Sequence, residues 1–230
     1  MLIQPNRRLT RRVPFNLICL IVLLAAAAPA TLADELAIWN FNDSDLNVDH
    51  ASGTLISNFN LANILFAAGT TNNARLGDAA GQSLSLQGGS STANNGHHIT
   101  FNVSTLGFSN IVVSFATQGT STGFNSNQFQ YSLDGTTFVN FGSPYTPANA
   151  FGSVPLVFSL ASVVALDNNP NAAFRIVFNG ATSATGTNRV DNFVVEGTEI
   201  QSVPEPMSAI LLLTGLSGLY RVRKRKRAAK

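Results

Sequence analysis

The chain has 230 residues, a formal net charge of +2 and a hydrophobic content of 45%. The charges are unevenly placed, because residues 34–200 hold eleven acidic residues against three arginines and no lysine, a net charge of −8. Nucleic-acid binding depends on Lys and Arg side chains that neutralise phosphates, so this charge argues against a nucleic-acid partner. A segment of this length is sufficient for one domain with a substantial core.

Residues 1–33 have the three parts of a secretory signal peptide. Four arginines come first, then an apolar stretch, then two cleavage sites of small residues: Arg7, Arg8, Arg11 and Arg12; Phe15–Ala28; Ala28-Pro29-Ala30 and Thr31-Leu32-Ala33. Pro14 interrupts the twin-arginine pattern, so we expect export by the general secretory route. Cys19 lies inside this segment, and the exported protein would therefore contain no cysteine and no disulfide.

Residues 34–200 alternate apolar and polar side chains between clusters of Gly, Asn, Ser and Thr. This pattern is typical of short strands that bury one face. The strands that we expect are, in chain order, Leu36–Phe41, Ser83–Leu86, His98–Val103, Asn110–Thr117, Gln128–Leu133, Ala173–Phe178 and Asn192–Glu196. The predicted fold is all-β, an antiparallel β-sandwich.

Two local signals predict turns within this domain. Asp134-Gly135 lies inside the segment Tyr131–Phe138, and Asp-Gly favours a tight hairpin because glycine accepts a positive φ. Leu160–Leu166 is predicted to form one or two helical turns. The run Asp167-Asn168-Asn169-Pro170 would end them, since the residue before a proline disfavours the helical conformation.

The sequence marks no catalytic residue. His97 and His98 are adjacent, and adjacent residues of a strand point to opposite faces, so the pair favours a polar strand start over a metal site. His50 is the third histidine. Serines are plentiful, but a Gly-x-Ser-x-Gly nucleophile elbow is absent. The paired carboxylates of a polysaccharide hydrolase are not marked either. We therefore predict a protein that is not an enzyme.

Three acids follow the first predicted strand at Asp43, Asp45 and Asp49. Carboxylates at such spacing could coordinate calcium. The segment lacks the glycine and the closing glutamate of an EF-hand loop, so an acidic, solvated loop is the alternative.

The aromatic residues divide into a predicted core and one candidate for a sugar-stacking platform. Six phenylalanines follow the strand alternation and are expected in the core: Phe41, Phe101, Phe115, Phe129, Phe174 and Phe178. Trp39 is in phase with Phe41, so it is predicted to be buried as well. Tyr145, between two prolines, is predicted to be the best exposed aromatic.

Residues 201–230 combine a proline-bounded motif, an apolar segment and a basic end. The motif is Val203, Pro204, Glu205 and Pro206, the apolar segment is residues 207–220, and the basic end is residues 221–230. The basic cluster consists of Arg221, Arg223, Lys224, Arg225, Lys226 and Arg227, which would stay cytoplasmic by the positive-inside rule. The apolar segment is predicted to be a short transmembrane helix, although it is below the ~20 residues of a full span. An ordinary single-pass anchor is the alternative.

This three-part tail resembles the PEP-CTERM sorting signal of Gram-negative bacteria, with the motif at Pro204, Glu205 and Pro206. The resemblance implies that an exosortase, a membrane enzyme, recognises and cleaves the tail. It also implies transient anchoring in the inner membrane, followed by release to the cell surface or the extracellular matrix of a biofilm.

Three short segments resemble strands of bacterial extracellular jelly rolls, which include carbohydrate-binding modules and adhesin domains. They are Ala37–Asn42, Tyr131–Phe138 and Arg189–Phe193. In such jelly rolls an acid of the last strand can meet N-terminal acids at a structural calcium ion, which here implies Asp191 with Asp43 and the Asp34–Glu35 region. The alternative is that Asp191 pairs with an arginine or caps a turn.

Three functions stay open at this level. We favour a non-catalytic exported protein of the surface or extracellular matrix, processed by an exosortase through its tail. The alternative is a carbohydrate-binding or adhesive module tethered to the membrane, with extracellular polysaccharide as its partner. A polysaccharide hydrolase is the third hypothesis.

Overall fold

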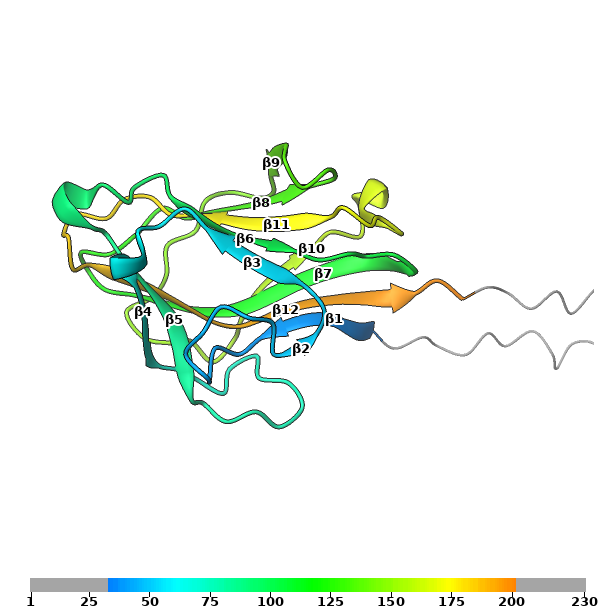
Figure 1. The fold of residues 1–230 in the computed structure, drawn as a ribbon, viewed down its shortest axis with the longest axis horizontal. Helices are drawn as coiled ribbons and strands as arrows, with labels where there is room; N and C mark the ends of the chain where they lie inside the picture. Colours follow the sequence, from blue (N-terminus) through cyan, green and yellow to red (C-terminus); the bar gives the residue numbers. More distant parts are fainter. Residues whose placement is uncertain (1–32, 202–230) are drawn as a thin grey trace, which may run out of the picture. The chain divides into compact units, whose positions relative to one another are not determined.

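The computed structural model describes residues 33–201, which form an antiparallel sandwich of two β-sheets (Figure 1). The larger sheet has seven strands. They are β1 (Ala33–Trp39), β2 (His50–Ala51), β4 (Ile64–Ala68), β5 (Gln82–Gln87), β7 (Phe108–Gly119), β10 (Leu156–Ser159) and β12 (Thr187–Glu199). The predicted all-β, antiparallel sandwich is confirmed for this part of the chain.

The second sheet has five strands in the order β3-β6-β11-β8-β9. Their bounds are Thr54–Ser57 for β3, His98–Asn102 for β6, Ala173–Val177 for β11, Gln128–Ser132 for β8 and Phe138–Asn140 for β9. Three short 3-10 turns complete the elements: η1 (Leu61–Asn63), η2 (Ser90–Thr92) and η3 (Val164–Leu166). The predicted helical turns before Asp167 are thus realised as one 3-10 turn, η3, with Asp167 as its cap.

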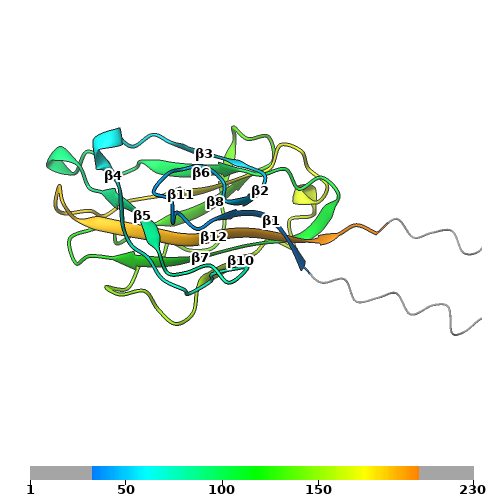
Figure 2. The ribbon, with the colours of Figure 1, turned by 60° about the horizontal axis from the view of Figure 1, so that its bottom comes forward.

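The long strand β12 organises the seven-stranded sheet. It lies beside β7 along most of its length, as both views show (Figure 2). On its other side it pairs first with β5 and then with β1. The pairing of Ala33 with Thr198 brings the two ends of the described segment to the same end of the sandwich.

Aromatic side chains fill the space between the sheets. Phe101 of one sheet stacks on Phe193 of the other, with ring centroids 3.5 Å apart. Trp39 meets Phe101 edge-on at 4.9 Å and is fully buried. The prediction that Trp39 and the six phenylalanines form the core is confirmed, because all of them are at most 1% exposed.

The sequence pattern found the interior strands of the two sheets and missed the edge strands. The seven predicted strands correspond to β1, β5, β6, β7, β8, β11 and β12, while β2, β3, β4, β9 and β10 were not predicted. The Asp134-Gly135 hairpin exists, but Ser132 pairs with Phe138, so five residues rather than two connect β8 to β9. The last strand begins at Thr187, five residues before its predicted start.

A bulge in β12 anchors the loop that joins β4 to β5, residues 69–81. At Asp191 and Asn192 the register to β7 shifts, and Asn192 has a φ of 48°. Asp191 accepts a hydrogen bond from the Thr70 amide at 2.7 Å. The side-chain amide of Asn192 donates to the carbonyls of Thr70 and Asn72 at 2.8 and 2.9 Å. The side chains of the bulge therefore hold the 69–81 loop against the sheet by binding backbone groups of that loop.

The same loop is fixed at two further points. Asn73 donates to the Asn192 carbonyl at 2.7 Å and to the Ser114 hydroxyl at 3.1 Å. Arg75 forms an ion pair with Glu196 at 2.9 Å. These contacts attach the 69–81 loop to β7 and β12 together.

The predicted signal peptide and the predicted sorting tail, with its transmembrane helix, lie outside the described residues except at their boundaries. Within residues 33–201, no helical segment has the length and apolar character needed to cross a membrane.

We predict that Gly69→Ala destabilises the domain by about 1–3 kcal/mol, the usual cost of overpacking. An added Cβ would lie 2.5 Å from Asp191 Oδ2 and 2.6 Å from the Gln82 carbonyl oxygen, and closer still to that of Ala80. Backbone groups cannot move aside as a flexible side chain can. The free energy of unfolding, measured with denaturant, tests this.

Gly152→Ala is the matched control, since the nearest atom to its Cβ would lie at 3.6 Å. We expect it to unfold like the unchanged protein. Equal stability of the two variants would contradict the close fit at Gly69.

Candidate functional site

The outer surface of the five-stranded sheet carries mostly polar side chains. Alternation places the core residues of these strands inward and their neighbours outward. The outward set includes Ser132, Ala173 and Val177 and the residues called here the polar sheet face, which are Thr54, Ile56, His98, Thr100, Asn102, Gln128, Gln130, Phe138, Asn140 and Arg175. All residues of the polar sheet face but the buried Thr100 are at least partly exposed.

Pairing across the sheet aligns these side chains in rows. One row runs across all five strands, from Ile56 through Thr100, Arg175 and Gln130 to Asn140. Gln130 donates to the Asn140 amide oxygen at 2.8 Å. The next row contains Asn102, which donates to the Thr54 hydroxyl at 3.2 Å. Amides and hydroxyls that bond to each other across strands form an ordered set of donors and acceptors.

Arg175 lies at the centre of the polar sheet face. Its Nε donates to the Thr100 hydroxyl at 2.9 Å. Its guanidinium carbon lies 3.4 Å from the centroid of the Phe138 ring, a cation–π contact. Partial burial lowers the pKa of Arg175 from its ordinary value, yet an arginine stays protonated in proteins. The bond to Thr100 and the contact with Phe138 hold the positively charged guanidinium of Arg175 against the face.

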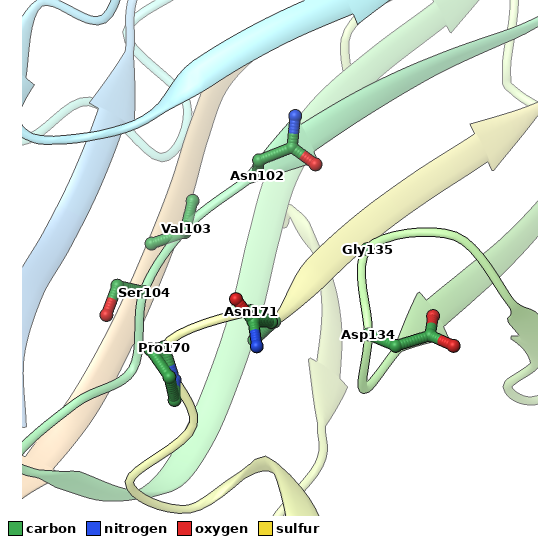
Figure 3. A pocket seen from close by; sticks show the side chains of 8 residues that line it. Asn102, Val103, Ser104, Asp134, Gly135, Pro170 and Asn171 are labelled. Atoms are coloured by element: carbon green, nitrogen blue, oxygen red, sulfur yellow. The ribbon is translucent and has the colours of Figure 1, made fainter.

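A pocket of about 260 Å³ continues the polar sheet face at the end where β6 stops and β11 starts (Figure 3). Its lining comes from the last residue of β6 and from the loops that adjoin β6, β8 and β11: Asn102, Val103, Ser104, Asp134, Gly135, Pro170, Asn171 and Ala172. Asn102 belongs to both the face and the pocket, so the two surfaces are continuous.

Asp134 is the single carboxylate among the pocket-lining residues. Figure 3 shows its side chain turned away from Asn171 and toward its own loop. It accepts hydrogen bonds from the backbone amides of Thr136 and Thr137 at 2.8 and 2.6 Å. These bonds stabilise the ionised form and hold the pKa of Asp134 well below its usual range. The group thus lacks both the raised pKa of a general acid and the second carboxylate that glycoside hydrolysis needs.

The two adjacent histidines point in different directions. His97 precedes β6 and packs edge-on against Phe59, with ring centroids 5.3 Å apart, and its buried Nδ1 has no hydrogen-bond partner in residues 33–201. His98 begins β6 and lies on the polar sheet face. This separation agrees with the predicted polar strand start. His50 lies 3.7 Å from an Asp78 oxygen.

The acids of the loop after β1 are occupied locally. Asp43 accepts from the Asp45 amide at 3.3 Å, and Asp45 accepts from the Asn47 amide at 2.7 Å. Asp49 accepts from the Asn40 amide at 2.7 Å, and its partial burial raises its pKa. Residues 33–201 contain no group of three or more His, Cys, Asp or Glu side chains placed to hold a metal ion.

Asp191 is fully buried, and both of its oxygens accept bonds from backbone amides, those of Thr70 and Asn192. No arginine pairs with it in the described part of the chain. Glu35, which was predicted to join it, lies near Arg75 instead, at 3.9 Å. The calcium ion expected at Asp191 and Asp43 stays a prediction.

The burial of the Asp191 carboxyl group predicts that the stability of the folded domain falls as pH rises. Burial raises its folded-state pKa from 3.8 to about 7. Between these values the folded protein keeps a proton that the unfolded chain has lost. The free energy of unfolding should therefore decrease across this window, by up to about 4 kcal/mol. Asp49, whose pKa is also raised, acts in the same direction.

Denaturant unfolding at several pH values across this window measures the slope. Asp191→Asn removes the titrating group, and the slope of the variant should be flatter. A slope equal to that of the unchanged protein would contradict the assignment to Asp191.

The prediction that Tyr145 is the best exposed aromatic is wrong. Its ring lies 6.1 Å from Phe115 and 6.4 Å from Phe158, against the core. Its hydroxyl is buried, and burial raises its pKa. The reason is that its backbone pairs with Asn127, which draws the segment inward. Phe138 is the aromatic of the polar sheet face, and the Asp-Gly turn before it was the signal that could have located it.

Comparisons with known proteins give matches among solved structures alone. No family model matches the chain, and no curated protein matches its sequence. The xylan-binding CBM22-1 domain of Xyn10C from Paenibacillus barcinonensis is a similar solved structure, with a TM-score of 0.45, 11% identity, and coverage of 75% of this chain and 99% of that chain.

Two others are similar to the same degree. The K3 cleaved adhesin domain of Lys-gingipain from Porphyromonas gingivalis has a TM-score of 0.46 and 13% identity, over 72% of this chain and 99% of that chain. TmCBM61, solved with β-1,4-galactotriose, has a TM-score of 0.42 and 10% identity, over 68% and 92%. At this identity the likeness concerns the fold alone.

Proposed function

We propose that this protein is a non-catalytic surface module that binds polysaccharide through the polar sheet face. The observation that carries the proposal is the continuous set of amide, hydroxyl and guanidinium groups on that face, which runs into the pocket at Asn102. Sugars present hydroxyl groups that both donate and accept, and side-chain amides can do the same.

The shape of the site supports a chain-like ligand. The polar rows cross five strands, and neighbouring strands of a sheet lie about 4.8 Å apart. Such a surface can contact several consecutive sugar units, while the pocket accepts one group at its end. The exposed Ile56 and the Phe138 ring add apolar area at opposite edges of the face. The site contains donors, acceptors and apolar patches, but no pair of facing carboxylates.

The hydrogen-bonded pair Gln130 and Asn140 provides a direct test. We expect Gln130→Ala/Asn140→Ala to weaken polysaccharide binding about tenfold, because two amides are lost from the face. Isothermal titration of the full chain with soluble xylan, galactan and polygalacturonate measures the affinity.

The control is Ser183→Ala/Thr185→Ala, which removes another exposed pair, 3.3 Å apart, outside the polar sheet face. Its affinity should equal that of the unchanged protein. Absence of binding to every polymer, or equal losses in both double variants, would overturn the proposal.

We further infer that the protein reaches the surface through the general secretory route and is processed by an exosortase. What supports this is the order of the signals: a signal peptide at residues 1–33, the motif at residues 203–206, an apolar segment and a basic cluster. The alternative is a module that stays anchored in the inner membrane.

Replacement of Pro204, Glu205 and Pro206 by alanine should leave a longer form that stays in the membrane fraction, because the exosortase would no longer recognise the tail. Intact mass and terminal sequencing of the protein in cells and medium measure this. Normal processing and release of the altered protein would favour a plain anchor.

A further inference from the structure

We infer that the polysaccharide is anionic, and that a sugar carboxylate of the uronic acid type binds the free edge of Arg175. The inference rests on the proposed function and names the class of its ligand. It follows from the donors that Arg175 leaves unused, from the absence of acids on the face, and from a histidine beside it.

Arg175 differs from the other two arginines of the domain because both of its Nη atoms are left without a hydrogen bond among the residues that the structure describes. Arg75 is paired with Glu196 at 2.9 Å. Arg189 donates through Nη1 to the Ala68 carbonyl at 3.1 Å and to Gln118 at 3.4 Å. In Arg175 the Nε is bonded to Thr100, while Nη1 and Nη2 have no hydrogen-bond partner within residues 33–201. Two parallel N–H groups therefore remain for an external group.

A carboxylate fits this edge by geometry. The two Nη atoms of a guanidinium match the two oxygens of a carboxylate in a bidentate, charge-assisted pair. Phe138 supports the guanidinium from one side and keeps it flat, with the guanidinium carbon 3.4 Å from the ring centroid. A group that is already positioned loses less entropy when it binds. Arg175 is therefore prepared for a planar acid rather than for a neutral hydroxyl.

The immediate surroundings of Arg175 on the polar sheet face contain no acid. None of the eleven acids of residues 34–200 belongs to the polar sheet face itself, although the domain as a whole is acidic. Asp134 lines the adjoining pocket, where the amides of Thr136 and Thr137 bind its carboxylate.

His98, with His97 beside it in the chain, is the titratable group of the face whose pKa responds to the charge of Arg175. Burial, the charge of Arg175 and His97 lower the pKa of His98. An anion bound at Arg175 would offset the positive charge of Arg175 and thereby raise the pKa of His98. Binding of the anion should therefore be coupled to protonation of His98.

The test compares polygalacturonate with the same polymer after reduction of its carboxyl groups, which keeps the sugar backbone and removes the charge. Binding to the full chain is measured by isothermal titration at low salt. We expect the reduced polymer to bind about tenfold or more weakly, as for loss of one charge-assisted pair. Affinity for the charged polymer should rise as pH falls through the range in which His98 takes up a proton.

Variants locate the effect at one residue. Arg175→Gln should lose most of the preference for the charged polymer while it still binds the reduced one. Arg189→Gln, which removes an equal charge from the other sheet, should keep the preference. His98→Gln should flatten the pH dependence without abolishing the preference. The circular dichroism spectrum of each variant confirms that it is folded.

The outcomes separate this inference from the proposed function. Equal binding of both polymers, or a preference that survives Arg175→Gln, would overturn the anionic ligand and leave polysaccharide binding intact. Failure of both polymers to bind, together with failure of xylan and galactan, would overturn the proposed function itself.

Discussion

The domain depends on the bulge at Asp191 and Asn192, where β12 exchanges one partner strand for another. Before the bulge β12 pairs with β5, and after it with β1, while β7 runs along the other side. A strand that changes partner leaves backbone groups of the adjoining loop unpaired, and buried backbone groups need hydrogen-bond partners. The two side chains of the bulge supply them to Thr70 and Asn72. The buried carboxylate is costly to ionise, which is why this stabilising contact also makes the fold sensitive to pH.

The alternation of apolar residues was sufficient to predict the central strands but not their partners. β6, β8 and β11 contain phenylalanine, tyrosine or isoleucine at every second position, so their pattern is clear. β3, β4 and β10 are edge strands of four or five residues that lack fully buried side chains, and their pattern is weak. The Arg189–Phe193 motif was recognised as part of the last strand. Its role could not be read, because the loop that it holds lies about 120 residues earlier in the chain.

The candidate site could not be recognised in the sequence either, because its residues are far apart in the chain. Its side chains come from five strands, and contacts such as Arg175 with Thr100 or Asn102 with Thr54 join residues that are 75 and 48 positions apart. Each of these residues alone has the character of an ordinary polar position on an exposed strand face. Only the register of the sheet shows that they share one surface. Tyr145 illustrates the opposite error, since two flanking prolines indicated exposure, whereas pairing with Asn127 turned the residue inward.

The position of the site within the domain and the short range of its charge bear on how a sugar chain would be recognised. Residues 33 and 201 leave the sandwich at the same end, and the Ile200 amide bonds to the Gly107 carbonyl there. The pocket, which includes Ser104, lies at this end, whereas His98 marks the opposite end of β6. Arg175 lies between them, on the row that crosses all five strands. Arg175 lies within an acidic domain, and its charge attracts an anion only at short range, because charges beyond about 8 Å are largely screened at physiological salt. Recognition would then require the sugar chain to lie along the face, so that neutral contacts at Asn102 and Gln130 act together with the charge.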